Sequence, residues 1–177
     1  MKTPKKSKQR LLSADEHEEH VCSIISSMLR NTKAAQKQRL LSKFVENDFE
    51  KVDRLIELHL KYLEKVEQVE EQLKFKRPGM EEFEDEEDEA EANYLKRLSG
   101  GLFTLQLIDY IILEICVSPD AAKIKLRLNK LIKTHPNASL KTIRNVMREY
   151  AGNLGESGDA EWREQEKIHI ISLIDRF

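Results

Sequence analysis

Residues 102–117 constrain the fold of this 177-residue chain more than any other stretch. Twelve of these sixteen residues are apolar, with a double glycine before them and a proline two residues after. A helix that is apolar nearly all round must be buried on most sides. The stretch is too short to span a membrane, and Gln106, Asp109 and Glu114 interrupt it. We therefore predict a central helix on which the rest of the chain packs.

The first helix has a clear start signal. Ser13 followed by Glu16 has the spacing of a capping box, so a helix is expected from there to about Asn31. Its apolar residues recur at helical spacing, which predicts a stripe facing the core made of Val21, Ile24, Ile25, Met28 and Leu29.

Further helices follow, and no segment has the pattern of a β-strand. The third, starting at Asn47 or Asp48, extends for about 26 residues, or roughly 39 Å. The last is expected to begin after Asp159 and to run to the end of the chain. Short connections make consecutive helices antiparallel neighbours, as in bundles and in α-solenoids. The residue pattern predicts an all-α fold and leaves these two architectures open. The remaining helices are expected over about 32–46, 92–98, 118–135 and 139–150.

Two charged segments divide the chain into 1–12, 13–77, 78–91 and 92–177. Residues 1–12 contain five basic residues and no acid, which predicts a flexible basic arm. Residues 80–91 contain nine acids, and such a block repels itself, so 78–91 is predicted to be a disordered acidic loop. The basic arm fits either an inter-helix segment or a short nuclear-localisation signal, the latter made of Lys5, Lys6, Lys8 and Arg10.

The pattern predicts no catalytic, cofactor or metal site, and therefore no enzyme. His17 and His20 are three residues apart, whereas the zinc-protease motif places its histidines four apart, and no third ligand is near. His59 falls in an apolar stripe and is interpreted as a histidine at the edge of the core. Cys22 and Cys116 lie in apolar stretches and are interpreted as small buried side chains in a reducing compartment.

The balance of charge differs along the chain. Overall, 30 basic and 32 acidic residues nearly cancel, but eight basic residues face only two acids between Pro119 and Tyr150. This run is either a solvated surface or a nucleic-acid-binding module, and it lacks the aromatic residues that nucleic-acid surfaces interleave. The candidate face for a protein partner or a nucleic acid consists of Lys123, Arg127, Lys130, Lys141, Arg144 and Arg148.

Beyond these patterns, the chain resembles the C-terminal region of the beta-catenin-like protein 1 family of nuclear armadillo-repeat proteins. The resemblance includes loops and charged positions as well as apolar ones. It is carried by Glu18–Ile24, Leu29–Asn31, Glu46–Asp48, Glu50–Leu55, Gly101–Cys116, Ile143–Arg144, Glu149–Ala151, Asn153–Gly155, Trp162–Glu164 and Phe177.

The resemblance implies the C-terminal repeats of an armadillo/HEAT-like α-solenoid, with the last helix as a polar-faced cap. Because family members are much longer, it also implies that Met1 is internal to a longer chain. It further implies a nuclear scaffold that associates with the Prp19/Cdc5-like splicing complex and binds basic nuclear-localisation segments of other proteins. Direct nucleic-acid binding and membrane association are not expected, whereas self-association is expected of a solenoid with an exposed apolar end.

Overall fold

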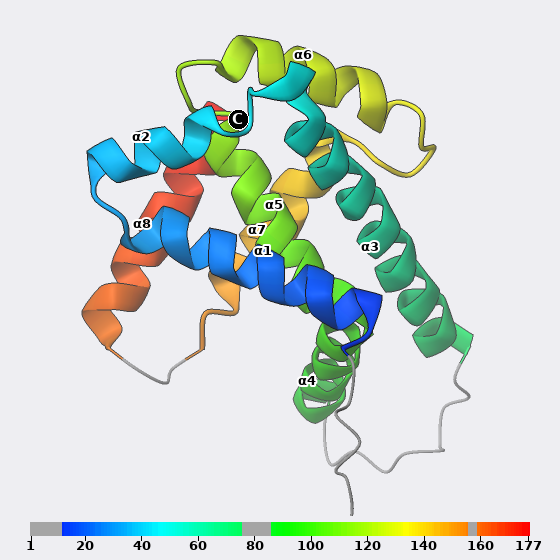
Figure 1. Cartoon of the computed structure of the whole chain (residues 1–177). Coiled ribbons are helices and arrows are strands. Elements are labelled where there is room, and N and C mark those ends of the chain that lie inside the picture. The colour runs from blue at the N-terminus through cyan, green and yellow to red at the C-terminus, as the bar shows by residue number, and fades with distance from the viewer. Residues whose placement is uncertain (1–11, 76–85, 156–158) are drawn as a thin grey trace, which may run out of the picture.

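The computed structural model describes residues 12–75, 86–155 and 159–177, and these are built from α-helices without a β-strand (Figure 1). A 3₁₀ turn, Asn47–Phe49, precedes the third helix, and a π turn, Leu98–Leu102, joins the fourth to the fifth. The predicted all-α fold is confirmed. The helices are α1 (Ala14–Asn31), α2 (Ala34–Ser42), α3 (Glu50–Phe75), α4 (Glu86–Arg97), α5 (Phe103–Ile115), α6 (Ala121–Ile132), α7 (Leu140–Gly152) and α8 (Ala160–Arg176).

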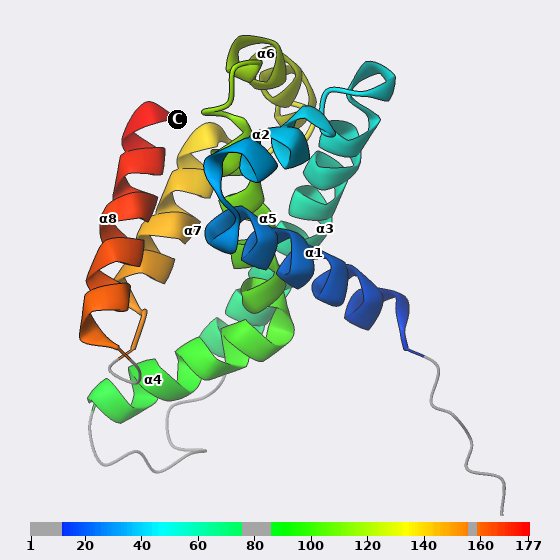
Figure 2. The same cartoon turned by 60° about the vertical axis from the view of Figure 1, so that its left-hand side comes forward.

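Helix α5 lies in the middle of the molecule, as predicted (Figures 1 and 2). It packs against α1, α3, α7 and α8, and eleven of its thirteen residues are buried. The buried residues include the three polar ones that interrupt its apolar sequence, and each has a hydrogen-bond partner on another helix. Gln106 donates to the Tyr94 hydroxyl at 3.3 Å, while Asp109 and Glu114 join the two clusters described below.

The double glycine bends a continuous helix, whereas we predicted that it would separate two. Gly101 has φ +129°, a conformation that side-chain-bearing residues rarely adopt. Gly100 lies against α3 so closely that an added Cβ would sit 2.5 Å from Cγ2 of Val69. The two glycines therefore let the chain turn from α4 into α5 while its backbone touches α3.

The predicted acidic loop 78–91 is wrong over its second half, because α4 begins at Glu86. The first half lies outside the described residues. Arg97 anchors α4 between two other helices, through ion pairs with Glu70 of α3 and Glu149 of α7. The acids lie at the N-terminal end of α4, where the helix dipole favours negative charge. These contacts outweigh the mutual repulsion of the acids from which disorder was predicted.

The run from Asp88 to Ile115, which combines α4, the π turn and α5, is long and apolar enough to cross a membrane by length and composition alone. However, 72% of its most apolar window is buried inside the protein. Such burial is the property of a core helix.

Helix α1 begins as predicted and is held to α3 by charge. The Ser13 hydroxyl accepts from the Glu16 amide, and the Glu16 carboxylate accepts from the Ser13 amide, which completes the capping box. In the same first turn, Asp15 binds Lys61 and Lys65 of α3. These two hydrogen bonds lower the pKa of Asp15 to about 2. The acids of α1 thus fix its orientation on α3.

Helix α8 packs on α7 at the other side of the molecule and differs from the polar-faced cap that we expected. Trp162, Ile168 and Ile171 are all exposed on it. Charged side chains are exposed between them, among them Glu164 and Lys167. The outer surface of α8 is therefore mixed in character.

Candidate interaction surfaces

A fully buried pair of ionisable side chains joins the two central helices α3 and α5. Nδ1 of His59 lies 2.5 Å from Oδ1 of Asp109, and neither side chain is exposed to solvent. Burial raises the pKa of Asp109. The electrostatic interaction and the hydrogen bond with His59 act in the opposite direction, but burial outweighs them. Nε2 of His59 and Oδ2 of Asp109 have no hydrogen-bond partner. We predicted His59 at the edge of the core, whereas it lies inside, where no substrate reaches it.

A second cluster gathers around the buried carboxylate of Glu114. It accepts hydrogen bonds from Lys37 of α2 at 2.9 Å, from Tyr110 at 2.8 Å and lies 2.7 Å from Nε2 of His169 of α8. Burial alone would raise the pKa of Glu114, but the hydrogen bonds from His169, Lys37 and Tyr110 outweigh it. The pKa lies below its ordinary value of 4.5. This carboxylate ties three helices together.

Arg30, at the end of α1, adds a neighbouring contact to the same region. Its Nε donates to Glu166 of α8 at 2.6 Å, and its guanidinium lies 3.9 Å from the centre of the Tyr110 ring. Because the partners of Arg30 and Glu114 are other residues of the same chain, both clusters hold the helices together.

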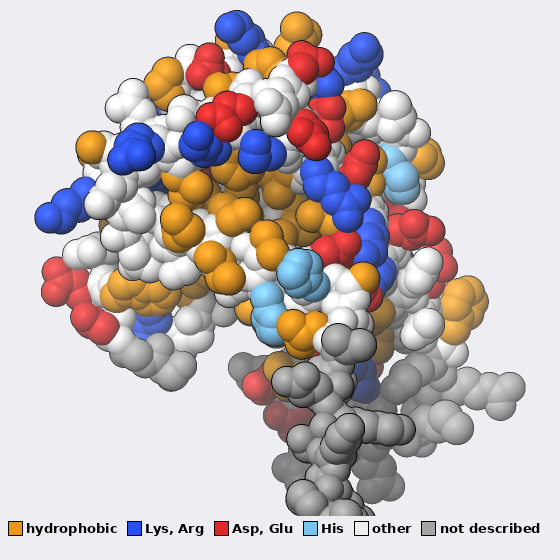
Figure 3. Space-filling view, viewed as in Figure 1, with side chains coloured by type: hydrophobic (Ala, Val, Ile, Leu, Met, Phe, Trp, Pro, Cys, Tyr) orange, Lys and Arg blue, Asp and Glu red, His pale blue; other side chains and the backbone are white. Residues whose placement is uncertain are grey.

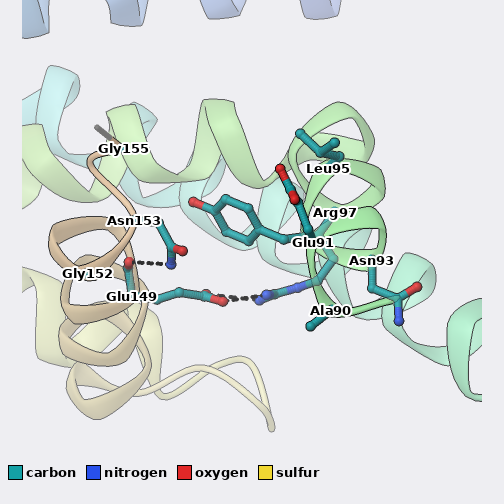
Figure 4. Close-up of a pocket in the computed structure, with 10 residues that line it drawn as sticks. Ala90, Glu91, Asn93, Leu95, Arg97, Glu149, Gly152, Asn153 and Gly155 are labelled. Atoms are coloured by element: carbon teal, nitrogen blue, oxygen red, sulfur yellow. Dashed lines mark hydrogen bonds and ion pairs between the residues drawn. The ribbon is translucent and has the colours of Figure 1, made fainter. Parts of the chain in front are cut away.

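A groove of about 740 Å³ lies between α4 and the C-terminal end of α7 (Figure 4). Arg97 and Glu149 meet across it in a bidentate ion pair, with distances of 2.5 and 3.1 Å. Glu91 and Leu95 of α4 are exposed at its margin, and Asn153 faces them from the end of α7. The groove therefore combines an acid, an amide and an apolar side chain, a lining suited to a peptide.

The outer face of α1, formed by His17, His20, Val21, Ile24 and Met28, is a second candidate surface. We predicted that Val21, Ile24 and Met28 face the core, and this is wrong: they are 41%, 60% and 43% exposed. The residues of α1 that are buried are Cys22, Ser26 and Leu29. Figure 3 shows hydrophobic side chains gathered across this side of the molecule, bordered by histidines.

Comparison with known proteins identifies the family. A family model described as "Catenin-beta-like, Arm-motif containing nuclear" matches residues 1–148. The chain belongs to this catenin-beta-like family. The resemblance drawn from its residues is confirmed, and the family's Arm motif identifies the stacked helices as an armadillo-like solenoid. The description of the family as nuclear supports a nuclear location.

Members of the catenin-beta-like family align with the whole chain. It is 43% identical over 180 residues to beta-catenin-like protein 1 of Bos taurus and 41% identical over 179 residues to that of Homo sapiens. The homolog of Schizosaccharomyces pombe is 24% identical over 92% of this chain. The chain spans 31% of the length of the bovine and human relatives.

The structure of this family member separates the basic residues that the sequence grouped. Arg127 of α6 is held by Asp53 of α3 at 2.7 and 2.5 Å, and Arg144 of α7 lies over the ring of Phe177. Helix α6 packs on α3, whereas α7 packs on α5 and α8. The other four basic residues are exposed, and they lie on two different helices: Lys123 and Lys130 on α6, Lys141 and Arg148 on α7.

The other predicted sites have different outcomes. Lys5, Lys6, Lys8 and Arg10 lie outside the described residues. His17 and His20 are exposed on α1, and among the described residues no group of three or more His, Cys, Asp or Glu side chains could hold a metal ion. Cys22 and Cys116 are buried free thiols, as predicted, and burial raises their pKa values to about 11 and about 12.

Sequence reasoning missed both candidate surfaces. The groove combines residues about 60 positions apart, and nothing local signals their approach. For α1 a signal was present. The apolar residues of α1 occupy two sides of the helix, and such a helix packs against neighbours on both sides.

Proposed function

We propose that this chain is a non-enzymatic interaction scaffold, part of a nuclear armadillo protein that works with the Prp19/Cdc5-like splicing complex. The observation that carries the proposal is the 43% and 41% identity to beta-catenin-like protein 1, which extends over the whole chain. The buried polar clusters support it, because each bonds helices of the chain to one another. What the surface offers is a groove and an apolar helix face.

Within this proposal, the groove beside α4 takes a basic segment of a partner, such as a nuclear-localisation segment. Glu91 is exposed at the groove, and further acids precede it on α4. Opposite charges at an interface steer association and select the partner. Asn153, across the groove, donates from Nδ2 to the Glu149 carbonyl at 2.8 Å, and its Oδ1 can accept from an N–H of a peptide backbone.

A pull-down from nuclear extract tests the scaffold role. The chain is immobilised after being joined to the part of the bovine relative outside the matched stretch, and the bound proteins are identified by mass spectrometry. Splicing proteins are expected among those retained. Retention of none of them, by a bait shown to be folded by circular dichroism, would refute the splicing role.

A direct binding measurement tests the groove. Fluorescence polarisation of a labelled basic nuclear-localisation peptide is followed as the 177-residue chain is added. We expect Glu91→Lys to weaken binding by roughly tenfold, since it reverses a charge at the groove. Glu64→Lys makes the same change at an exposed position of α3 outside the groove lining. Equal affinities of the two variants would show that only overall charge matters.

The second candidate function is nucleic-acid binding through α6 and α7. One observation favours it: Lys123, Lys130, Lys141 and Arg148 have no acidic partner among the described ion pairs. Their division between two helices that pack on different neighbours weighs against a single continuous face.

A further inference from the structure

Helix α1 is apolar on two opposite sides. Toward α5 it buries Cys22 and Leu29, together with Ser26, whose hydroxyl donates to the Leu107 carbonyl at 3.3 Å. On the other side Val21 and Ile24 are exposed. A surface helix normally presents one apolar stripe to the core and polar residues to water. The pattern of α1 is that of a helix lying between two layers.

The outer face of α1 also lacks charge. From His17 to Met28, none of the exposed residues is Lys, Arg, Asp or Glu. The acids of this part of α1 point elsewhere: Glu18 binds Lys61 and Arg54 of α3, and Glu19 accepts from the Thr104 hydroxyl. In a chain that is 35% charged, an exposed helix side without charge over about three turns stands out.

The exposed surface of α8 is different. Trp162, Ile168 and Ile171 are exposed on α8, but Glu164 and Lys167 are exposed among them. Repeat proteins need a polar outer surface at a terminal repeat, whereas an internal repeat buries both sides against its neighbours. The two helices therefore differ in exposed charge: α1, which exposes none over this stretch, resembles a helix of an internal repeat, whereas the outer surface of α8 is mixed.

We propose that the outer face of α1 is the surface on which a neighbouring armadillo-type repeat packs, supplied by the part of the family's longer chain that lies outside these 177 residues. The matched stretch is only 31% of the bovine and human relatives, so those proteins have the additional chain. The neighbour would bring an uncharged helix face, because Val21, Ile24 and Met28 offer no charge to pair. This inference deepens the scaffold proposal, but it rests on the solenoid and not on the splicing role.

The test compares one substitution in two settings. Ile24→Glu is made in the 177-residue chain and in the same chain joined to the part of the bovine relative outside the matched stretch. In the chain alone, where Ile24 is 60% exposed, the melting temperature is expected to stay unchanged. In the joined protein it should fall by several degrees, because a charge is then buried without a partner. Leu126→Glu, at a position of α6 that is 74% exposed, should change neither protein.

Hydrogen exchange gives a second measure. In the joined protein the amides of α1 should exchange at least roughly tenfold more slowly than in the chain alone, and Ile24→Glu should remove this protection. Equal exchange in the two proteins would overturn the inference, as would an equal effect of Ile24→Glu on both melting temperatures. A dimer that Ile24→Glu dissociates, and that forms in the joined protein as well as in the 177-residue chain, would also overturn it, by assigning the surface to a second copy.

The two proposals fail in different ways. A joined protein that protects α1 but retains no splicing protein from nuclear extract would refute the proposed function and leave this inference standing. The reverse result would refute the inference alone.

Discussion

Asp109 and His59 place two ionisable side chains at the centre of an otherwise apolar core. Removing one partner of such a pair leaves the other buried and unpaired. We expect Asp109→Ala to lower the free energy of unfolding by about 3–5 kcal/mol. Adding His59→Leu to that variant should restore much of the loss. The resulting apolar pair has a similar total volume and leaves no ionisable group buried without a partner. Urea unfolding of both variants measures this, and equal losses would contradict it.

The carboxylate of Glu114 makes the stability of the folded protein depend on pH. Since its folded-state pKa is lowered below 4.5, its contribution is present above that pH and is lost as the pH falls through the folded value. Glu114→Gln removes the charge, so the variant should be less stable than the wild type at neutral pH, by about 1–3 kcal/mol. The gap should narrow below about pH 4. Melting curves between neutral and acid pH test this, and a constant gap would show that the charge of Glu114 is irrelevant.

The π turn between α4 and α5 depends on close contact with α3. Gly100→Ala places a methyl group against Val69, and we expect a loss of about 1–3 kcal/mol through overpacking. Gly152→Ala, at the end of α7, is the matched control, because nothing lies within 4 Å of its added Cβ. That variant should be neutral or stabilised by up to about 1 kcal/mol. Chemical denaturation compares the two, and similar values would argue against the contact.

At the scale of the whole molecule, the exposed basic residues of α6 and α7 are divided between two helices that pack on different neighbours, which makes strong nucleic-acid binding through them unexpected. Retention of the chain on an RNA column should be lost at moderate salt. Replacing Lys130 and Lys141 by Glu should reduce the slope of affinity against salt concentration by no more than the equivalent of about two ionic contacts. A steep salt dependence that this double variant abolishes would instead favour the nucleic-acid-binding function. Arg127→Glu is no suitable probe, because Arg127 is engaged by Asp53.

How much the sequence predicts depends on whether a feature is local. The Ser13 cap, the end of α1 at Asn31 and the length of α3 all follow from neighbouring residues, and all are confirmed. The acids of α4 were misjudged because Arg97 meets Glu70 and Glu149 only when three helices come together. The groove was missed for the same reason.

The sequence by itself determined that this protein is all-α, that α5 lies at its centre and that it belongs to the catenin-beta-like family. Periodic apolar residues specify a helix, and a helix that is apolar all round must be buried. Only the tertiary structure decided which side of α1 faces the core, because Val21 and Ile24 are as apolar as Leu29. The choice depends on the pairing of Asp15 and Glu18 with basic residues of α3, which turns Leu29 inward and leaves Val21 and Ile24 outside.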